Sequence, residues 1–209
     1  MNTVFTRIFN PPSFNKGEIL RYAGVKELTA EIDTLIEECI EEAKDKLIYK
    51  VCYGHFPLSF IQMKSEKLEK NLSGCNSIVL FAATVGIELD RLISRYGKIS
   101  PAKALIFQAI GTERIESLCD EFCRFAETEY GHTKPRFSPG YGDLPLEVQK
   151  DFFRVLEPSK RIGLTLNESM LMTPSKSVTA IIGTTDEEIT EKKSCKTCNK
   201  TDCLFRRTL

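Results

Sequence analysis

The sequence predicts an α+β fold in which helices pack around a small, mainly antiparallel, twisted sheet. Residues 47–58 have an extended pattern and residues 77–83 form a continuous apolar run, so each is expected to form a strand. Two more apolar runs, 164–172 and 177–183, flank the turn residues 173–176 and predict a β-hairpin. Helices combined with a short antiparallel sheet are typical of the α+β class.

End signals indicate several helices, of which three are long. Thr29 can cap a helix whose apolar residues recur at spacings of three and four. A second helix follows the bend at Thr84-Val85-Gly86 and is expected to end at Gly97. Ser100-Pro101 is a strong start signal, with Ser as the cap and Pro at the first position, and the pattern continues for about thirty residues to Gly131.

The composition is that of a globular protein. The chain has 209 residues, of which 42% are hydrophobic and 28% charged, enough for one domain with a sizeable core. Lys plus Arg equals Asp plus Glu at 29 each, which argues against nucleic-acid or membrane-surface binding through bulk charge. Since no segment resembles a signal peptide or a membrane span, we expect a cytoplasmic protein with reduced cysteines.

The C-terminal end has a different character. We predict a domain over residues 1–183, followed over 184–209 by a polar linker and a Cys-rich tail that contains Cys195, Cys198 and Cys203. A CxxC pair with a third cysteine supplies three thiolates for zinc or an iron–sulfur cluster, each of which commonly takes a fourth ligand. Candidates for that ligand are Cys119, Cys123, His132 or a residue of a second chain. The alternatives are a redox dithiol or cysteines without a shared function.

The densest cluster of Pro and Gly lies between Arg136 and Pro145. The run Arg136-Phe-Ser-Pro-Gly-Tyr-Gly-Asp-Leu-Pro145 predicts a loop with a specified, non-repeating path. A guanidinium beside such a bend suits a carboxylate or phosphate; the alternative is a structural loop in which Arg136 pairs with an acidic side chain. Glu116 and Asp120, one helical turn apart, form either an acidic edge or a contact to a cationic ligand.

Four ordered blocks in the second half of the chain carry a family resemblance. They are the Arg136–Pro145 run, Lys160-Arg-Ile-Gly163, Leu166-Asn-Glu-Ser169 and Pro174-Ser-Lys-Ser-Val178. Their content, order and spacing resemble the activation domain of cobalamin-dependent methionine synthase. The N-terminal third is similar to that of stand-alone activation-domain-like proteins from anaerobic bacteria.

The resemblance implies a protein that binds S-adenosylmethionine and reactivates a corrinoid methyltransferase such as methionine synthase, as a component of that activity. It would support the reductive methylation of cob(II)alamin, with the cobalamin held by the partner. That partner would be a corrinoid protein or a methionine synthase lacking its own activation domain, and the electron donor a flavodoxin or ferredoxin. Because cob(I)alamin is itself a strong nucleophile, the chain would contribute positioning rather than an acid or base.

The resemblance also implies roles for individual residues. Arg136 would pair with the methionyl carboxylate, and Glu116 would face the amino group of the ligand. Backbone and an aromatic face would come from Pro139, Gly140 and Tyr141. A wall beside the ligand or the corrinoid would be formed by Glu168, Ser169, Ser177 and Val178.

Two other functions fit the sequence. The family continues after its last strand into an aromatic pair, whereas here Gly183 is followed by Thr184-Thr185-Asp186. Because this aromatic pair is missing, the second function is that of a docking module for a corrinoid protein, without binding of the methyl donor. The third function is an electron-transfer accessory, with a Cys-ligated cluster in the tail near the cobalt.

Overall fold

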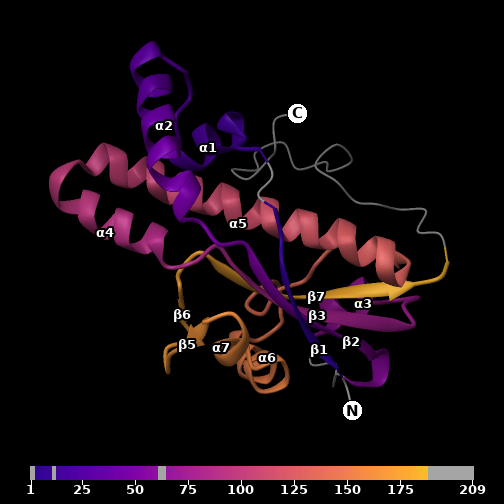
Figure 1. Ribbon diagram of the computed structural model, residues 1–209. Coiled ribbons are helices and arrows are strands. Elements are labelled where there is room, and N and C mark those ends of the chain that lie inside the picture. Colours follow the sequence, from indigo (N-terminus) through magenta and orange to yellow (C-terminus); the bar gives the residue numbers. More distant parts are fainter. Residues whose placement is uncertain (1–2, 11–12, 61–64, 188–209) are drawn as a thin grey trace.

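A five-stranded antiparallel sheet forms the centre of the structure, a computed structural model that describes residues 3–10, 13–60 and 65–187 (Figure 1). In spatial order the strands are β1 (Val4–Ile8), β2 (Lys50–Pro57), β3 (Ser77–Thr84), β7 (Ser177–Thr185) and β4 (His132–Thr133). Every neighbouring pair is antiparallel. The predicted α+β class, with helices around a mainly antiparallel sheet, is confirmed.

Helices cover both faces of the sheet (Figure 1). One face carries α1 (Lys16–Ala23), α2 (Ala30–Ala43), α4 (Glu88–Ile99) and the long α5 (Pro101–Tyr130). The other carries α3 (Glu66–Asn71), α6 (Gln149–Leu156), α7 (Pro158–Arg161) and the small hairpin of β5 (Thr165–Leu166) and β6 (Met172–Thr173). We call these two sides the α5 face and the α6 face.

The strand β3 explains why its sequence is apolar without alternation. Val79 and Phe81 belong to the core on the α5 face, whereas Ile78 and Leu80 belong to the core on the α6 face. Both faces of a central strand are therefore removed from water, and burial of apolar surface on both sides stabilises it.

Local signals define most helix ends. Ser100 caps α5, because its Oγ accepts a hydrogen bond from the N–H of Lys103, and the helix ends before Gly131, whose φ is 86°. The predicted end of α4 at Gly97 is wrong. Gly97 does not adopt a positive φ, and the helix closes only where the N–H of Ser100 donates to the carbonyl oxygen of Tyr96.

The predicted hairpin of residues 164–172 with 177–183 is also wrong. Strand β7 pairs with β3 along its length, from Ser77 opposite Thr184 to Thr84 opposite Ser177. The reason is that β7 is apolar on both faces, with Ile181 in the core of the α6 face and Ile182 in that of the α5 face, so it takes a central place. Residues 164–173 supply only the two-residue strands β5 and β6.

The strand β7 also extends past the predicted domain boundary at Gly183. Thr184 and Thr185 are buried and lie opposite Thr133 and His132 of β4, so they belong to the sheet rather than to a linker. Two strands, β1 and β4, were not predicted. Most side chains of β1 are exposed and β4 has only two residues, so neither has the alternation that marks a strand.

Candidate functional site

The segment after β4 directs the side chain of Arg136 toward α5. The N–H of Lys134 donates to the carbonyl oxygen of Gly183 at 2.9 Å, and Phe137 exchanges both backbone hydrogen bonds with Ile181 at 2.8 Å. Pro135 has no N–H and interrupts the ladder between these two points. Phe137 packs into the core of the α6 face, so the preceding side chain, Arg136, points to the α5 face.

Two carboxylates of α5 hold the guanidinium of Arg136. Its Nη1 lies 2.5 Å from Oδ1 of Asp120, and its Nη2 lies 2.5 Å from Oε2 of Glu116. Because the two acidic residues are four positions apart, their side chains are neighbours on the helix surface. The Arg136 side chain is 22% exposed and each carboxylate 34%, so this ion-pair cluster lies at the rim of the core and remains accessible.

The surroundings of the cluster raise the pKa values of both Arg136 and Cys123. Burial disfavours the charge on Arg136, but the acidic groups around it, Cys119, Asp120 and Glu116, outweigh this, so the pKa of Arg136 is raised. The Sγ of Cys123 lies 3.9 Å from Nη1 of Arg136, and burial raises the pKa of that thiol. The site therefore combines a guanidinium whose pKa is raised with two acidic side chains and a thiol whose pKa is also raised.

The sequence names Cys123 as a candidate fourth metal ligand and does not predict its place beside Arg136. The signal was present in the spacing, since Cys123 is three residues after Asp120 and seven after Glu116 on one helix. Residues at such spacings share a helix face.

The loop after Arg136 has the fixed path that its sequence predicts. The carbonyl oxygen of Ser138 accepts from the N–H of Tyr141 at 3.1 Å, and that of Leu144 accepts from the N–H of Gly140 at 2.9 Å. Gly140 and Gly142 have φ values of 82° and 65°, in the left-handed region that favours glycine. The turn therefore depends on glycine at both positions.

One carboxylate and one aromatic ring tie this loop to its surroundings. Asp143 accepts hydrogen bonds from the Ser65 hydroxyl and from the N–H of Lys67 at the start of α3. The bond from Ser65 lowers the pKa of Asp143. Tyr141 is 68% exposed and meets the buried ring of Phe137 edge to face at 5.4 Å between centroids. The loop thus holds an exposed aromatic ring in a defined position.

The structure brings some of the predicted site residues together. Arg136 contacts Glu116 directly, and the loop of Pro139, Gly140 and Tyr141 follows Arg136 without a break. Val178 packs against the core of the α5 face, the face on which Arg136 lies. Pro139 is buried, whereas Gly140 is exposed like Tyr141.

The other predicted wall residues lie elsewhere. The hydroxyl oxygen of Ser177 lies 2.8 Å from both the carbonyl oxygen of Pro174 and Oγ1 of Thr84. Because a carbonyl only accepts, Ser177 donates to Pro174 and receives from Thr84, so its hydroxyl is already engaged inside the fold. Glu168 and Ser169 are exposed in the turn between β5 and β6, on the α6 face. A role for these residues beside a ligand stays a prediction.

The predicted metal ligands Cys195, Cys198 and Cys203 lie outside the described residues, so that site also stays a prediction. In the part of the chain that the structure describes, no group of three or more His, Cys, Asp or Glu is arranged to hold a metal ion. Among the same residues, no helix combines the length and apolar composition needed to cross a bilayer.

Comparison with known proteins agrees with this architecture. The family model described as vitamin B12 dependent methionine synthase, activation domain, matches residues 59–190, a range that includes α5, the Arg136 loop and β7. No curated protein sequence matches the chain.

Among solved structures, the chain is similar to a MetH reactivation domain bound to AdoHcy. The identity is 15% and the TM-score 0.62, over 91% of this chain and 81% of that chain. This similarity shows a shared fold. Because the family model spans more than half of the sequence, the protein belongs to the family of vitamin B12-dependent methionine synthase activation domains.

Proposed function

We propose that the protein binds S-adenosylmethionine and supports reductive methylation of the cobalt on a corrinoid methyltransferase such as methionine synthase. The observation that carries this proposal is the geometry of Arg136. Its guanidinium is held at the rim of the core by Glu116 and Asp120, directly before a glycine-dependent loop with an exposed aromatic ring. Membership in the family and the AdoHcy bound to the related MetH domain support it.

The ligand's amino-acid end fits the charges of this cluster. A carboxylate can accept two parallel hydrogen bonds from a guanidinium, and an ammonium group pairs with a carboxylate. We assign the methionyl carboxylate to Arg136 and the amino group to Glu116. The carboxylate would take the place of Asp120 at Nη1, so binding exchanges one anion for another instead of burying a new charge.

The rest of the ligand would lie along the loop. Backbone at Gly140 can approach a ligand closely because no Cβ projects there. Tyr141 supplies a ring that is exposed at its outer side and supported by Phe137 at its inner side. The ring is therefore available to stack on an adenine or to meet a partner.

The reaction then requires the sulfonium to be held in line with the cobalt of the partner. The partner's cobalamin, reduced by one electron from a flavodoxin or ferredoxin, would accept the methyl group of the sulfonium and leave S-adenosylhomocysteine. The cobalt supplies the nucleophile, so this chain contributes orientation and exclusion of water.

An anaerobic reconstitution tests this function. A cobalamin-dependent methionine synthase that lacks its activation domain would be held as cob(II)alamin with a reductant and S-adenosylmethionine. We expect the visible spectrum to change to that of methylcobalamin only when this chain is added. An unchanged spectrum with S-adenosylmethionine bound to the chain would contradict the reactivation role.

A docking module without methyl-donor binding is the second candidate. It is favoured by Thr184 and Thr185, which are buried in β7 where the family has an aromatic pair. Co-purification with a corrinoid protein, together with no effect of S-adenosylmethionine on the melting temperature, would select it over the first. The electron-transfer alternative depends on the cysteine tail, and an anaerobic preparation without iron would count against it.

A further inference from the structure

The outer edge of β1 has no neighbouring strand among the residues that the structure describes. The N–H of Phe9 donates to the carbonyl oxygen of Tyr49 at 2.9 Å, and the register continues from Ile8 opposite Lys50 to Val4 opposite Gly54. Hydrogen bonding alternates along an antiparallel strand, so Phe5, Arg7 and Phe9 bond inward to β2. The N–H and C=O groups of Val4, Thr6 and Ile8 therefore point outward.

This edge is also apolar for an exposed strand. Within the described residues, β1 has a neighbouring strand on one side only. Phe5 is 46% exposed and Ile8 is 68% exposed. An apolar strand with a free edge is a template for pairing with another strand.

We propose that β1 pairs antiparallel with β1 of a second copy of this chain, around a two-fold axis at Thr6. Val4 then lies opposite Ile8 of the second copy, Phe5 opposite Arg7, and Thr6 opposite Thr6. This register uses every outward N–H and C=O of Val4, Thr6 and Ile8, because all three outward positions meet outward positions. The two sheets would become one continuous sheet.

The sequence of the strand explains why a second copy fits it. Val-Phe-Thr-Arg-Ile is chemically symmetric about Thr6: aliphatic residues meet at the ends, and an aromatic ring meets a guanidinium. Aliphatic pairs and cation–π pairs across strands are both favourable. An isologous contact requires this self-complementarity, which a strand selected for a different partner does not need.

Other registers are less favourable. A shift of one residue places the outward N–H and C=O groups of one copy opposite residues of the other copy whose backbone groups bond inward to β2. The hydrogen bonds between the two copies are then lost. A shift of two residues in either direction shortens the pairing of Val4–Ile8, and in one direction it also places Arg7 opposite Arg7, which is repulsive. The register centred on Thr6 is therefore specified by both hydrogen bonding and charge.

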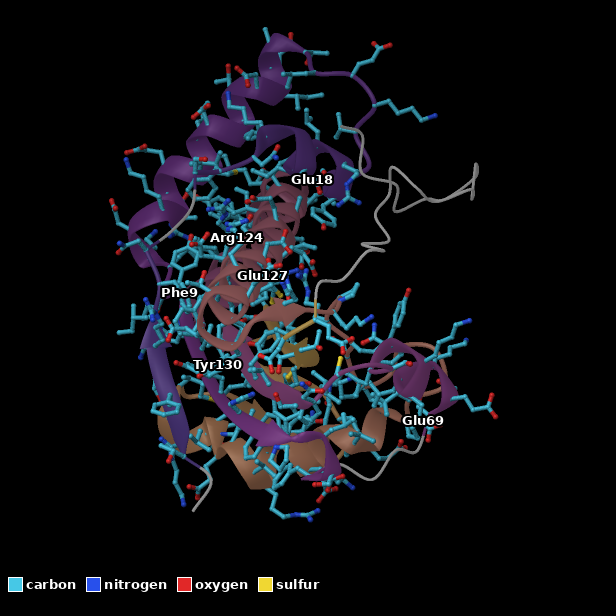
Figure 2. All side chains as sticks on the ribbon, turned by 90° about the vertical axis from the view of Figure 1, so that its right-hand side faces the viewer. Phe9, Glu18, Glu69, Arg124, Glu127 and Tyr130 are labelled. Atoms are coloured by element: carbon cyan, nitrogen blue, oxygen red, sulfur yellow. The ribbon has the colours of Figure 1, made fainter. Side chains whose placement is uncertain are left out.

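A groove borders β1 on the α5 face. This groove of about 490 Å³ lies beside β1 and the last turns of α5, and its lining includes Arg7, Phe9, Arg124 and Thr128. Figure 2 shows Phe9 and Arg124 on this side of the molecule. Phe5 of the second copy would enter next to Arg7, whose guanidinium lies 4.1 Å from the ring centroid of Phe125. The formal net charge of zero means that two copies do not repel each other through bulk charge.

Sedimentation equilibrium over a concentration series tests this dimer. We expect the weight-average mass to rise from 23.7 kDa toward twice that value. A contact built on one strand pair is small, so the rise should depend on concentration. A wild-type mass that stays at 23.7 kDa over the whole series would overturn the proposal.

A pair of charge variants tests the register. Phe5→Lys places a lysine opposite Arg7 in both halves and should abolish the rise, and Arg7→Glu removes the cation–π pair and should weaken association. In an equimolar mixture, the new lysine of one variant lies opposite the new glutamate of the other in one half. The other half keeps the wild-type pair of Phe5 and Arg7, so association should return. A misfolded variant could not be rescued in this way, and the absence of rescue would contradict the register.

A matched control lies on another surface. Ile99, the last residue of α4, is 65% exposed. Ile99→Lys removes a comparable apolar side chain from a helix that lies away from β1 (Figure 1). The association of this variant should equal that of the wild type. An equal loss of association in Ile99→Lys would show that the contact does not use β1.

Discussion

The guanidinium of Arg136 lies 2.5 Å from the carboxylate of Glu116, although the two residues are 20 positions apart in the sequence. The contact joins the middle of α5 to the extended segment beside β7, so it connects a helix to the edge of the sheet. The same guanidinium reaches Asp120 through its other terminal nitrogen. These two carboxylates have different roles in the proposed complex, and that difference can be measured.

Substitution of the two carboxylates should have unequal effects on S-adenosylmethionine binding. Glu116→Gln removes the partner of the amino group and should weaken binding by roughly 1.5–3 kcal/mol, as for a hydrogen bond to a charged group. Asp120→Asn removes the competitor for Nη1, so affinity should be unchanged or higher. Equilibrium binding of both variants measures this, and equal losses would contradict the assignment.

Two glycines should respond to alanine with opposite signs. A Cβ on Gly183 would lie 2.5 Å from Sγ of Cys75 and 2.7 Å from Cδ2 of Leu72, both buried, so Gly183→Ala should destabilise the fold by roughly 1–3 kcal/mol. A Cβ on Gly97 in α4 would meet open space, and Gly97→Ala should stabilise by up to about 1 kcal/mol. Urea unfolding measures both, and the same sign at both positions would refute this packing.

The sequence predicted the elements whose signals are local. Ser100, Pro101 and Gly131 define α5 by capping and turn chemistry, and the structure places both ends where they indicate. The partner of residues 177–183 was wrong, because pairing of β7 with β3 is decided by burial on two faces of a sheet assembled from distant segments. Only the tertiary arrangement provides that information.

In the candidate site, too, the residues could be named from local signals but their contacts depend on the tertiary arrangement. Arg136, Glu116 and Asp120 were each named from residue type and spacing, yet no local pattern says that they meet. Their contact depends on β4 and the following segment pairing along β7, and β4 is too short to be predicted. The place of Ser177 was equally hidden: its hydroxyl is engaged by Thr84 at the end of β3, whereas residues 177–183 were expected to pair with residues 164–172.

The buried ion pair of Glu113 and Arg114 should be essential for stability. Both side chains are at most 2% exposed, and Arg114 also donates to the carbonyl oxygen of Ser13 at 2.9 Å. Glu113→Gln removes a buried carboxylate that pairs with a buried guanidinium and should cost roughly 3–5 kcal/mol. Glu88→Gln is the control, because its partner Arg91 is 68% exposed and such pairs contribute about 1 kcal/mol or less. Similar losses in the two variants would contradict the difference in burial.

The tether between Asp143 and Ser65 should give stability a dependence on acid pH. The hydrogen bond from Ser65 lowers the pKa of Asp143 below its usual 3.8 in the folded state. A depressed folded-state pKa contributes stability that is present above the unfolded-state pKa and lost as pH falls through the folded value. The melting temperature of the wild type should therefore approach that of Asp143→Asn as pH falls below 3.8. If the difference in melting temperature between the wild type and Asp143→Asn stayed constant as pH falls, this would argue against the tether.

Titration calorimetry with S-adenosylmethionine tests the central claim most directly, using the wild type, Arg136→Ala and the control Arg154→Ala. Arg154 is 76% exposed and pairs with Asp151 on α6, away from the site. We predict binding by the wild type and by Arg154→Ala, and a loss of roughly 1.5–3 kcal/mol in Arg136→Ala, as expected for a charge-assisted contact. Absence of binding by the wild type, or equal binding by a folded Arg136→Ala variant, would contradict it.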